Sequence, residues 1–364
     1  MKLNKLYLQS FRNLEETVLT PARHFNIFFG NNGQGKTNLL ESIFILATMK
    51  SFKTMKNSEL VQWGNPRSLL KGWVERDGLT REIAILLDMQ GKKIRVDRKT
   101  VSRIDDFFGQ LNVVLFTPEE VNMVKGLPEQ RRRYLDRAVF SSDVTYLSAY
   151  QAYGKVLKNR NALLKKGESC GLDIWTEQLV EQGKRLIMAR VAYIHGLRDL
   201  LGQFYREISG NEEIADIRYK PHRFDMADGG GNLQAAFTEA LAKTAREEER
   251  RGTTLTGPHR DDVEFTLNGK SLKQFGSQGQ QKTYVLALKM AETEYMSSKF
   301  HSQPVFLLDD ISSELDQDRK RNLMDFLKKR EMQVFITTTS LQNIVVDRME
   351  NYRTYRIEAG RVLH

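Results

Sequence analysis

The most constraining feature of this sequence is a glycine-rich segment, Gly30-Asn31-Asn32-Gly33-Gln34-Gly35-Lys36-Thr37, with the pattern G-x-x-x-x-G-K-T. The apolar run at 24–29 precedes it and reads as a buried strand. Apolar residues follow it at helical spacing, from Leu39 to Ala47. A strand, a glycine-rich loop and a helix in this order form the setting in which the pattern binds phosphate. The segment predicts a nucleoside triphosphate site, and an ordinary glycine- and asparagine-rich turn before a helix is the alternative.

Each part of the segment has an expected role. The glycines let backbone N–H groups turn toward phosphate oxygens, and the start of the following helix adds partial positive charge. Lys36 is expected to reach the β- and γ-phosphates, and the Thr37 hydroxyl to bind Mg²⁺. The predicted nucleotide-binding residues here are Gly30, Asn31, Asn32, Gly33, Gln34, Gly35, Lys36, Thr37 and Asn38.

Length and composition limit the class of protein. A chain of 364 residues exceeds a single core and predicts two or three domains. No apolar run is long enough to cross a bilayer, no signal-peptide core follows Met1, and a single cysteine excludes an intrachain disulfide. The scattered histidines have no metal-ligand spacing. We therefore expect a protein of the reducing cytoplasm.

The net charge of +10 favours a polyanionic partner, either nucleic acid or an anionic membrane surface. Basic residues gather after the first helix, on an expected β-hairpin and in the run Arg131–Arg133. Solvated basic faces are the alternative in general, and the arginine run has a second alternative, packing and pairing at the junction of a helical lobe. The predicted DNA contacts are Lys53, Lys56, Lys92, Lys93, Arg131 and Arg132.

The chain alternates between α/β and helical character. A strand meander is predicted at 69–76, 82–88 and 92–97, and a buried strand at 112–116. Two long helical stretches, about 143–166 and 172–208, are expected to form an antiparallel hairpin, and strands resume after Gly252. The predicted division is an α/β head made of 1–117 and 252–364, with an inserted helical lobe at 118–251.

A second half of the nucleotide site is predicted at the apolar strand 305–308, which ends in Asp309 and Asp310. A buried strand that delivers Asp at its carboxyl end is how phosphoryl-transfer sites hold Mg²⁺. Asp309 is therefore expected to hold Mg²⁺ together with Thr37. Asp310 is the candidate general base that polarises the attacking water. Alone, an apolar run ending in two carboxylates is a common chance match, and the phosphate loop upstream makes it specific.

The segment Ser277-Gln278-Gly279-Gln280-Gln281-Lys282 opens a predicted helix and resembles the signature loop of ABC-type ATPases. This resemblance implies that ATP with Mg²⁺ is the ligand. It also implies that Ser277, Gly279 and Gln280 contact the γ-phosphate of ATP held by a second copy, so that ATP bridges a homodimer. A polar loop that caps a helix is the alternative. The predicted catalytic residues are Lys36, Ser277, Asp309 and Asp310.

Two positions depart from the ABC-type pattern. The strand 333–336 ends where the superfamily usually carries a switch histidine, and here Thr338 or Thr339 takes that place. Asp310 stands where Glu is usual. Both differences predict slow hydrolysis. The segment Ser313–Asp316 corresponds to the D-loop.

Several segments resemble the RecF recombination-repair family: Leu8–Asn13, Pro118–Asp136, Thr256–Asp262, and Leu307–Asp316 with Arg319–Leu323. The resemblance covers essentially the whole chain. It implies an α/β fold, namely an ABC-type ATPase head with an antiparallel β-subdomain and a short helical lobe in place of the long arm of SMC proteins. It implies a cytoplasmic, nucleoid-associated protein that dimerises with ATP, binds double- and single-stranded DNA at gap junctions, and works with RecR and RecO to load RecA.

The resemblance leaves some residue roles open. Thr117 or Glu119 is expected to replace the glutamine of the Q-loop, and Arg12 and Asn13 are expected to flank the adenine or ribose. His259 and Arg260 have either a structural or a nucleotide-coupled role. The alternative functions are the nucleotide-binding subunit of a membrane transporter and an ATP-assembled DNA clamp or adaptor with little turnover.

Overall fold

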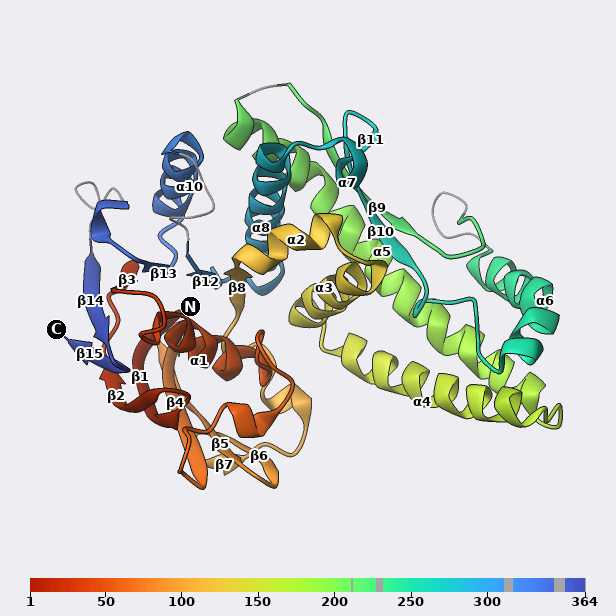
Figure 1. Cartoon of the computed structure of the whole chain (residues 1–364), viewed down its shortest axis with the longest axis horizontal. Helices are drawn as coiled ribbons and strands as arrows, with labels where there is room; N and C mark the ends of the chain where they lie inside the picture. The colour runs from red at the N-terminus through yellow and green to blue at the C-terminus, as the bar shows by residue number, and fades with distance from the viewer. Residues whose placement is uncertain (211, 227–231, 311–316, 344–350, 364) are drawn as a thin grey trace. The chain divides into compact units, whose positions relative to one another are not determined.

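A computed structural model describes residues 1–210, 212–226, 232–310, 317–343 and 351–363 (Figure 1). The chain forms two compact units. Unit 1 consists of Met1–Val121, Phe204–Glu212 and Lys282–His364, and unit 2 of Asn122–Gln203 and Glu213–Gln281. Both ends of the chain therefore belong to unit 1. The predicted division places 252–281 with the α/β head, whereas these residues pack within unit 2.

The first layer of unit 1 is a six-stranded sheet of order β15-β14-β3-β13-β12-β8. Its five longer strands are parallel, and β15 is antiparallel to β14. Every residue of β8, β12 and β13 is buried, as expected for a parallel sheet covered on both faces. The predicted strands at 24–29, 112–116, 305–308 and 333–336 are confirmed. The bounds are β3 Phe25–Phe29, β8 Val113–Phe116, β12 Val305–Leu308, β13 Val334–Thr338, β14 Tyr352–Glu358 and β15 Arg361–Leu363.

The second layer of unit 1 is an antiparallel sheet of order β2-β1-β4-β5-β6-β7. Buried residues alternate with partly exposed ones along β4 and most of β1, so one face packs into the core. The predicted meander is confirmed as β4, β5 and β6. The bounds are β1 Lys2–Phe11, β2 Leu14–Leu19, β4 Arg67–Arg76, β5 Leu79–Asp88, β6 Gly91–Val96 and β7 Lys99–Thr100.

Helix α1 (Lys36–Thr48) contacts strands of both sheets and is buried on nearly all sides from Leu39 to Leu46. One apolar cluster joins it to the two sheets, which fixes the helix that begins at the phosphate loop. The remaining helices of this unit include most of α8 (Gln278–Phe300) and all of α10 (Gln317–Lys329), together with the short turns Asn57–Glu59, Ile104–Asp106 and Leu341–Asn343.

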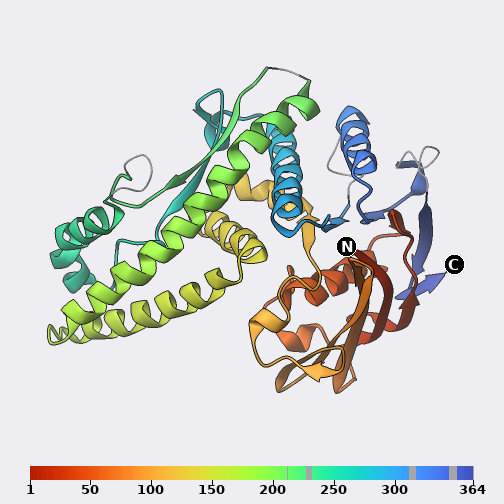
Figure 2. The same ribbon diagram turned by 180° about the vertical axis from the view of Figure 1, so that it is seen from behind.

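Unit 2 combines helices with a small sheet of order β11-β10-β9. The long helices α4 and α5 run side by side in opposite directions in both views, as predicted (Figures 1 and 2). Helices α5 and α6 pack at Gly183, where an added Cβ would lie 2.6 Å from the ring of Phe237. The bounds are α2 Pro118–Lys125, α3 Pro128–Ser142, α4 Thr145–Lys166, α5 Leu172–Ser209, α6 Leu233–Arg251, α7 Leu272–Phe275, β9 Ala215–Lys220, β10 Asp262–Leu267 and β11 Lys270–Ser271.

Candidate nucleotide-binding site

The glycine-rich segment forms the loop between β3 and α1, the position that the sequence predicts. Its glycines have positive φ angles, 142° at Gly30, 78° at Gly33 and 114° at Gly35. At Gly30 an added Cβ would lie 2.4 Å from the carbonyl oxygen of Ile357, so only glycine fits against β14 there. The loop ends at the N-terminus of α1, where unpaired backbone N–H groups and the helix dipole favour an anion.

Lys36 is folded back onto this loop. Its Nζ donates hydrogen bonds to the carbonyl oxygens of Gly30 (2.6 Å) and Asn31 (2.8 Å). Burial lowers the pKa of Lys36, and the nearby carboxylates of Asp310 and Asp309 oppose that shift. The ammonium group is thus held at the loop, facing carbonyls that a triphosphate can replace as its partners.

Asp309 receives two hydroxyl donors. Thr37 Oγ1 donates to Asp309 Oδ1 at 2.9 Å, and Thr337 Oγ1 donates to the same oxygen at 2.7 Å. The side chain is nearly buried, at 7% exposure. Burial raises the pKa of Asp309, although both hydroxyls and Lys53 oppose the shift. A buried carboxylate beside a threonine hydroxyl is a fitting place for a hard cation such as Mg²⁺.

Thr337 is a residue that the sequence reasoning did not single out within the threonine run. Its hydroxyl contacts Asp309 and also accepts the backbone N–H of Asp310 at 2.8 Å. It therefore fixes both carboxylate-bearing residues. Thr338 is buried and donates to the carbonyl oxygen of Ser340, whereas Thr339 is exposed after the end of β13. The choice between these two for the switch position stays a prediction.

A chain of polar contacts lines one edge of the loop. Asn13 Nδ2 donates to the carbonyl oxygen of Gln34 at 3.1 Å, and Asn38 Nδ2 donates to Asn13 Oδ1 at 2.8 Å. Lys53 Nζ donates to Asn38 Oδ1 at 3.1 Å. Burial lowers the pKa of Lys53, and the carboxylates of Glu41 and Asp309 oppose this. Lys53, predicted as a DNA contact, thus lies at the edge of the candidate nucleotide site.

Arg12 has several fixed partners. Its guanidinium makes a bidentate pair with the fully buried carboxylate of Glu41, at 2.8 and 2.9 Å. A further nitrogen donates to the carbonyl oxygen of Glu59 at 2.8 Å. These contacts fix the side chain of Arg12, the residue before Asn13. Its predicted contact with adenine or ribose stays a prediction.

The two residues proposed for the Q-loop differ in exposure. Thr117 is buried directly after β8, whereas Glu119 is exposed on α2. Glu119 is close enough to Asp309 to raise the pKa of that carboxyl. Both alternatives remain open. The predicted D-loop, Ser313–Asp316, lies outside the described residues.

The signature segment lies in unit 2 at the start of α8. The backbone N–H of Ser277 donates to Gln280 Oε1 at 2.8 Å, and the N–H of Gln280 donates to Ser277 Oγ at 3.2 Å. This reciprocal pair is a capping box, as the polar-cap alternative predicts. Ser277 is exposed, and Gly279 follows it in the first turn. Their predicted contact with a triphosphate stays a prediction.

The residues predicted to bind DNA have different surroundings. The side chain of Arg131 is only 6% exposed and forms a bidentate pair with Asp262, at 2.7 and 2.8 Å. This geometry favours the packing alternative for Arg131. Arg132 Nη1 donates to the carbonyl oxygen of Asp261 at 2.8 Å. Among the others, Lys92 Nζ donates to Met49 O at 2.6 Å, Lys56 lies 3.8 Å from Glu59, and Lys93 is exposed.

Two other features are absent from the described residues. No group of three or more His, Cys, Asp or Glu side chains there is arranged to hold a metal ion. A magnesium site of the phosphoryl-transfer type does not need one, since Mg²⁺ keeps several waters and takes few protein ligands. None of the helices in the described part of the chain has the length and apolarity to cross a bilayer.

Comparisons with known proteins agree with this geometry. The sequence matches the family model of the RecF/RecN/SMC N-terminal domain over residues 2–362. It is 77% identical, over the full length of both chains, to the DNA replication and repair protein RecF of Geotalea daltonii. A solved structure of the recombination mediator protein RecF-ATPrS in the RecFOR pathway superposes with a TM-score of 0.90 and 32% identity, over 99% of this chain and 97% of that one.

A more distant match identifies the fold. An SMC head bound to the C-terminal winged-helix domain of ScpA gives a TM-score of 0.59 at 15% identity, covering 100% of this chain and 97% of that one. At such identity the likeness extends to the fold alone. Together the matches confirm the predicted fold class, an α/β ABC-type ATPase head with an inserted helical lobe.

Proposed function

The chain belongs to the RecF family, and from this premise we propose that it is an ATP-dependent DNA-binding protein of recombinational repair and replication-fork recovery. It binds ATP with Mg²⁺, dimerises around the nucleotide and hydrolyses ATP slowly with stimulation by DNA. It acts in the cytoplasm at the nucleoid, on gapped DNA, and helps RecO and RecR to load RecA.

The observation that carries the proposal is the hydrogen bond from Thr37 to Asp309. It joins the end of the phosphate loop to a buried carboxylate on β12. Mg²⁺, when bound, neutralises charge on the phosphates and polarises the phosphorus for attack. Thr37 and Asp309 would hold this ion. Lys36, released from the carbonyls of Gly30 and Asn31, would place its ammonium on the β- and γ-phosphates.

Asp310 is the proposed general base for the attacking water. Its backbone N–H is held by Thr337, so the side chain starts from a fixed point at the end of β12. An Asp is one methylene shorter than the Glu usual at this position of ABC-type ATPases. A threonine at the switch position cannot carry the positive charge of a histidine. Both features support slow turnover.

Dimerisation would complete the site from a second copy. Ser277 caps the N-terminus of α8, and its backbone N–H donates a hydrogen bond to the side chain of Gln280. The exposed Ser277 hydroxyl lies at the helix N-terminus. That arrangement suits a γ-phosphate supplied by a partner. ATP shared by two copies would then couple nucleotide binding to closure on DNA.

The test is sedimentation of the protein with and without ATP, Mg²⁺ and gapped DNA. Wild type is expected to dimerise with ATP and Mg²⁺. Ser277→Arg is expected to remain monomeric while each copy still binds ATP. Ser298→Arg, an exposed position near the other end of α8, is the matched control and should dimerise. A wild-type protein that stays monomeric at saturating ATP, Mg²⁺ and DNA contradicts the proposal.

A second candidate is an ATP-assembled clamp or adaptor with little turnover. The short Asp310 and the threonine switch favour it. Asp310→Asn separates the two, because it should abolish hydrolysis without preventing ATP binding. If the variant still supports repair in cells while its hydrolysis is lost, the adaptor is preferred.

A further inference from the structure

Two buried arginines, Arg190 and Arg160, each form several hydrogen bonds in the interior of unit 2. Arg190, on α5, is 2% exposed. Its guanidinium donates to Asp136 Oδ1 at 2.6 Å, to Tyr146 Oη at 2.8 Å and to the carbonyl oxygen of Pro258 at 2.8 Å. A buried guanidinium is costly unless its nitrogens are paired, and these contacts pair them with three separate elements.

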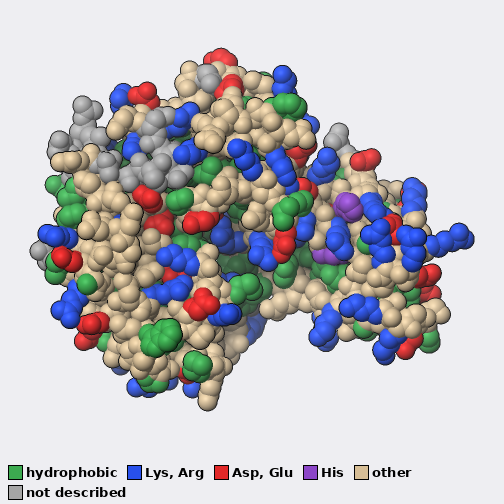
Figure 3. Space-filling view, in the orientation of Figure 1, with side chains coloured by type: hydrophobic (Ala, Val, Ile, Leu, Met, Phe, Trp, Pro, Cys, Tyr) green, Lys and Arg blue, Asp and Glu red, His purple; other side chains and the backbone are tan. Residues whose placement is uncertain are grey.

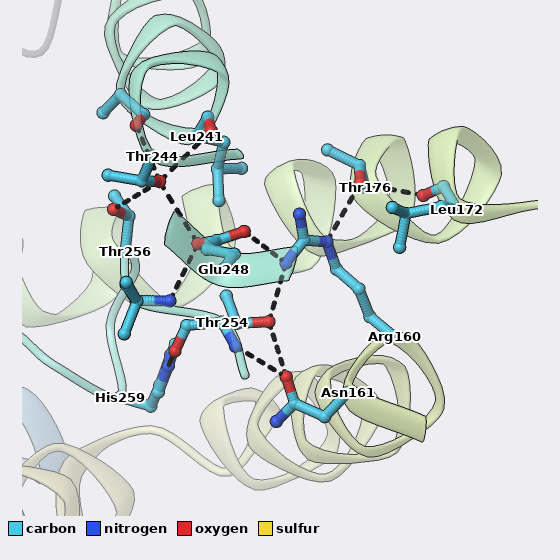
Figure 4. A network of polar contacts seen from close by, with 12 residues as sticks. Arg160, Asn161, Leu172, Thr176, Leu241, Thr244, Glu248, Thr254, Thr256 and His259 are labelled. Atoms are coloured by element: carbon cyan, nitrogen blue, oxygen red, sulfur yellow. Dashed lines mark hydrogen bonds and ion pairs between the residues drawn. The ribbon is translucent and has the colours of Figure 1, made fainter. Parts of the chain in front are cut away.

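The second arginine, Arg160 on α4, is 3% exposed and forms the centre of another network (Figure 4). It pairs with the fully buried Glu248 of α6 at 2.8 Å, and donates to Thr176 Oγ1 at 2.9 Å and to Thr254 Oγ1 at 2.8 Å. The backbone and hydroxyl of Thr254 also donate to Asn161 Oδ1, at 2.8 and 2.7 Å.

Both networks hold the same stretch of chain, residues 254–262. Arg160 holds its beginning at Thr254, and Arg190 holds its middle at Pro258. His259 lies between Tyr153 Oη, at 2.6 Å from Nδ1, and the carbonyl oxygen of Thr254, at 3.1 Å from Nε2. The stretch contains the Thr256–Asp262 motif of the sequence analysis. These contacts favour a structural role for His259 over a nucleotide-coupled one. The exposed Arg260 has no role assigned by them.

The anchored stretch presents basic side chains around Asp261. The carboxylate of Asp261 is fully buried, and it accepts hydrogen bonds from Tyr219 Oη and from the backbone N–H of His222, the latter at 2.7 Å. The carbonyl oxygen of Asp261 accepts from Arg132. The side chains of His222 and Arg260 are exposed, and that of Arg132 is half-buried. We call Arg132, His222 and Arg260 the Asp261 cluster.

The nearby charges are mixed at Arg132, where Asp262, Glu129 and Asp136 act on the guanidinium, and mostly positive at His222. Burial lowers the pKa of His222, and Arg223, Arg260 and Arg132 lower it further, while Asp261 alone opposes them. The adjacent Asp262 is already paired with Arg131, and Arg223 is paired with Glu247 at 2.9 Å. The face of this unit seen in Figure 3 carries many Lys and Arg side chains, with His and some Asp and Glu among them. A partner for this surface is expected to be anionic.

We propose that the Asp261 cluster binds backbone phosphates of nucleic acid. The inference rests on the proposed function and names residues through which the protein would contact DNA. Guanidinium groups match phosphate oxygens in bidentate geometry. A contact group works best on a backbone that is held in one conformation, and the two buried arginines supply that support to Arg260. Such contacts position DNA without reading its sequence.

The experiment measures binding of gapped DNA by fluorescence anisotropy, with ATP and Mg²⁺, over a range of salt concentrations. Loss of one phosphate contact reduces the slope of log K against log salt by about 1, for every DNA sequence. Arg260→Ala is expected to show this reduction and to bind about tenfold more weakly. Arg260→Lys, which keeps the charge, is expected to keep the wild-type slope. Lys158→Ala removes the same charge from an exposed position of α4 and serves as the control.

Each outcome has one meaning. If wild type and Arg260→Ala have the same slope and affinity, the cluster does not bind DNA, and an acidic protein surface is the better partner for it. If Lys158→Ala weakens binding as much as Arg260→Ala, the effect is general charge and the inference fails. If wild type itself does not bind DNA with ATP and Mg²⁺, the result contradicts the proposed function, and the inference that rests on it is contradicted too. Unchanged thermal unfolding of Arg260→Ala excludes misfolding as the cause.

Discussion

The hydroxyl of Thr37 and the carboxylate of Asp309 lie 272 residues apart in the chain and share a hydrogen bond of 2.9 Å. Burial raises the folded-state pKa of Asp309 above its ordinary value, so the folded state binds more protons than the unfolded state between the two pKa values. Stability is therefore lost as the pH rises through that window. At neutral pH the charged form costs stability, and the proposed Mg²⁺ would offset this cost.

The first prediction concerns Asp309→Asn. Without ligand, the variant is expected to unfold at a higher temperature than wild type, because the buried charge is gone. Wild type should gain about 2.7 kcal/mol when ATP with Mg²⁺ is present at 100 times its Kd, and the variant should gain much less. Differential scanning calorimetry with and without ATP and Mg²⁺ measures both effects. An equal ligand-induced rise in the two proteins contradicts the assignment of Asp309 to the metal.

The second prediction concerns the pair of Arg12 and Glu41. Arg12→Ala leaves a fully buried carboxylate without its cation and is expected to destabilise the protein by about 3–5 kcal/mol. Adding Glu41→Gln should recover part of the loss, since a neutral amide does not need a cation. Urea unfolding in a Trp175→Phe background reports unit 1, where the two remaining tryptophans lie. A double variant less stable than Arg12→Ala would argue against this reasoning.

The third prediction concerns Gly360, which follows β14 and reaches the phosphate loop. Its φ is 78°, an added Cβ would lie 2.0 Å from the carbonyl oxygen of Asn13, and its N–H donates to the carbonyl oxygen of Gln34 at 3.0 Å. Gly360→Ala should cost about 1–3 kcal/mol and weaken ATP binding, because the backbone at Asn13 must move.

Gly78→Ala is the matched control for this substitution. Its φ is also 78°, but an added Cβ there meets no atom within 4 Å. The control therefore carries the same backbone strain without the clash. Titration with a fluorescent ATP analogue compares the two variants, and equal affinities would mean that the close approach at Gly360 has no influence on the site.

The fourth prediction is a pH dependence centred on His259. Burial is the main cause that lowers the pKa of His259 to about 4. The unfolded state, with an ordinary pKa near 6.5, then binds the proton first, so stability falls as the pH drops from about 6.5 to about 4. The loss attributable to this one group is on the order of 3 kcal/mol.

His259→Gln is the comparison, because Gln does not titrate and can still donate and accept hydrogen bonds. Unfolding is followed by the fluorescence of Trp175, the tryptophan of unit 2, with the other two replaced by Phe. The difference in stability between wild type and His259→Gln should change between pH 6.5 and 4 and be flat above pH 7. A difference that stays constant with pH would show that the histidine keeps its ordinary pKa.

The sequence predicted the elements that carry local signals. The phosphate loop is recognisable from its glycines and the helical periodicity that follows it. The parallel strands are short and mostly apolar, so β3, β8, β12 and β13 were all expected. The long helices of unit 2 have a strong helical period. These features arise from neighbours in the chain, which a sequence displays directly.

The contacts missed by the sequence join distant segments. Thr337 sits in a run of three threonines, and only the pairing of β13 with β12 decides which hydroxyl meets Asp309. Arg131 and Arg132 are adjacent in the sequence, yet Arg131 is buried and paired with Asp262, whereas Arg132 is half-buried and donates to the carbonyl oxygen of Asp261. Charge alone does not separate a buried pair from a surface contact. Gly360 touches the loop only because β14 lies beside β3.

The same long separation between Thr37 and Asp309 has a consequence during synthesis. At about 5–20 residues per second, the ribosome adds Asp309 roughly 15–55 s after Thr37. Until residue 278 is added, a nascent chain has the loop but lacks both the signature helix and Asp309, the carboxylate proposed to hold magnesium. We expect that neighbouring chains on one polysome cannot pair through ATP, and that assembly begins only among finished molecules.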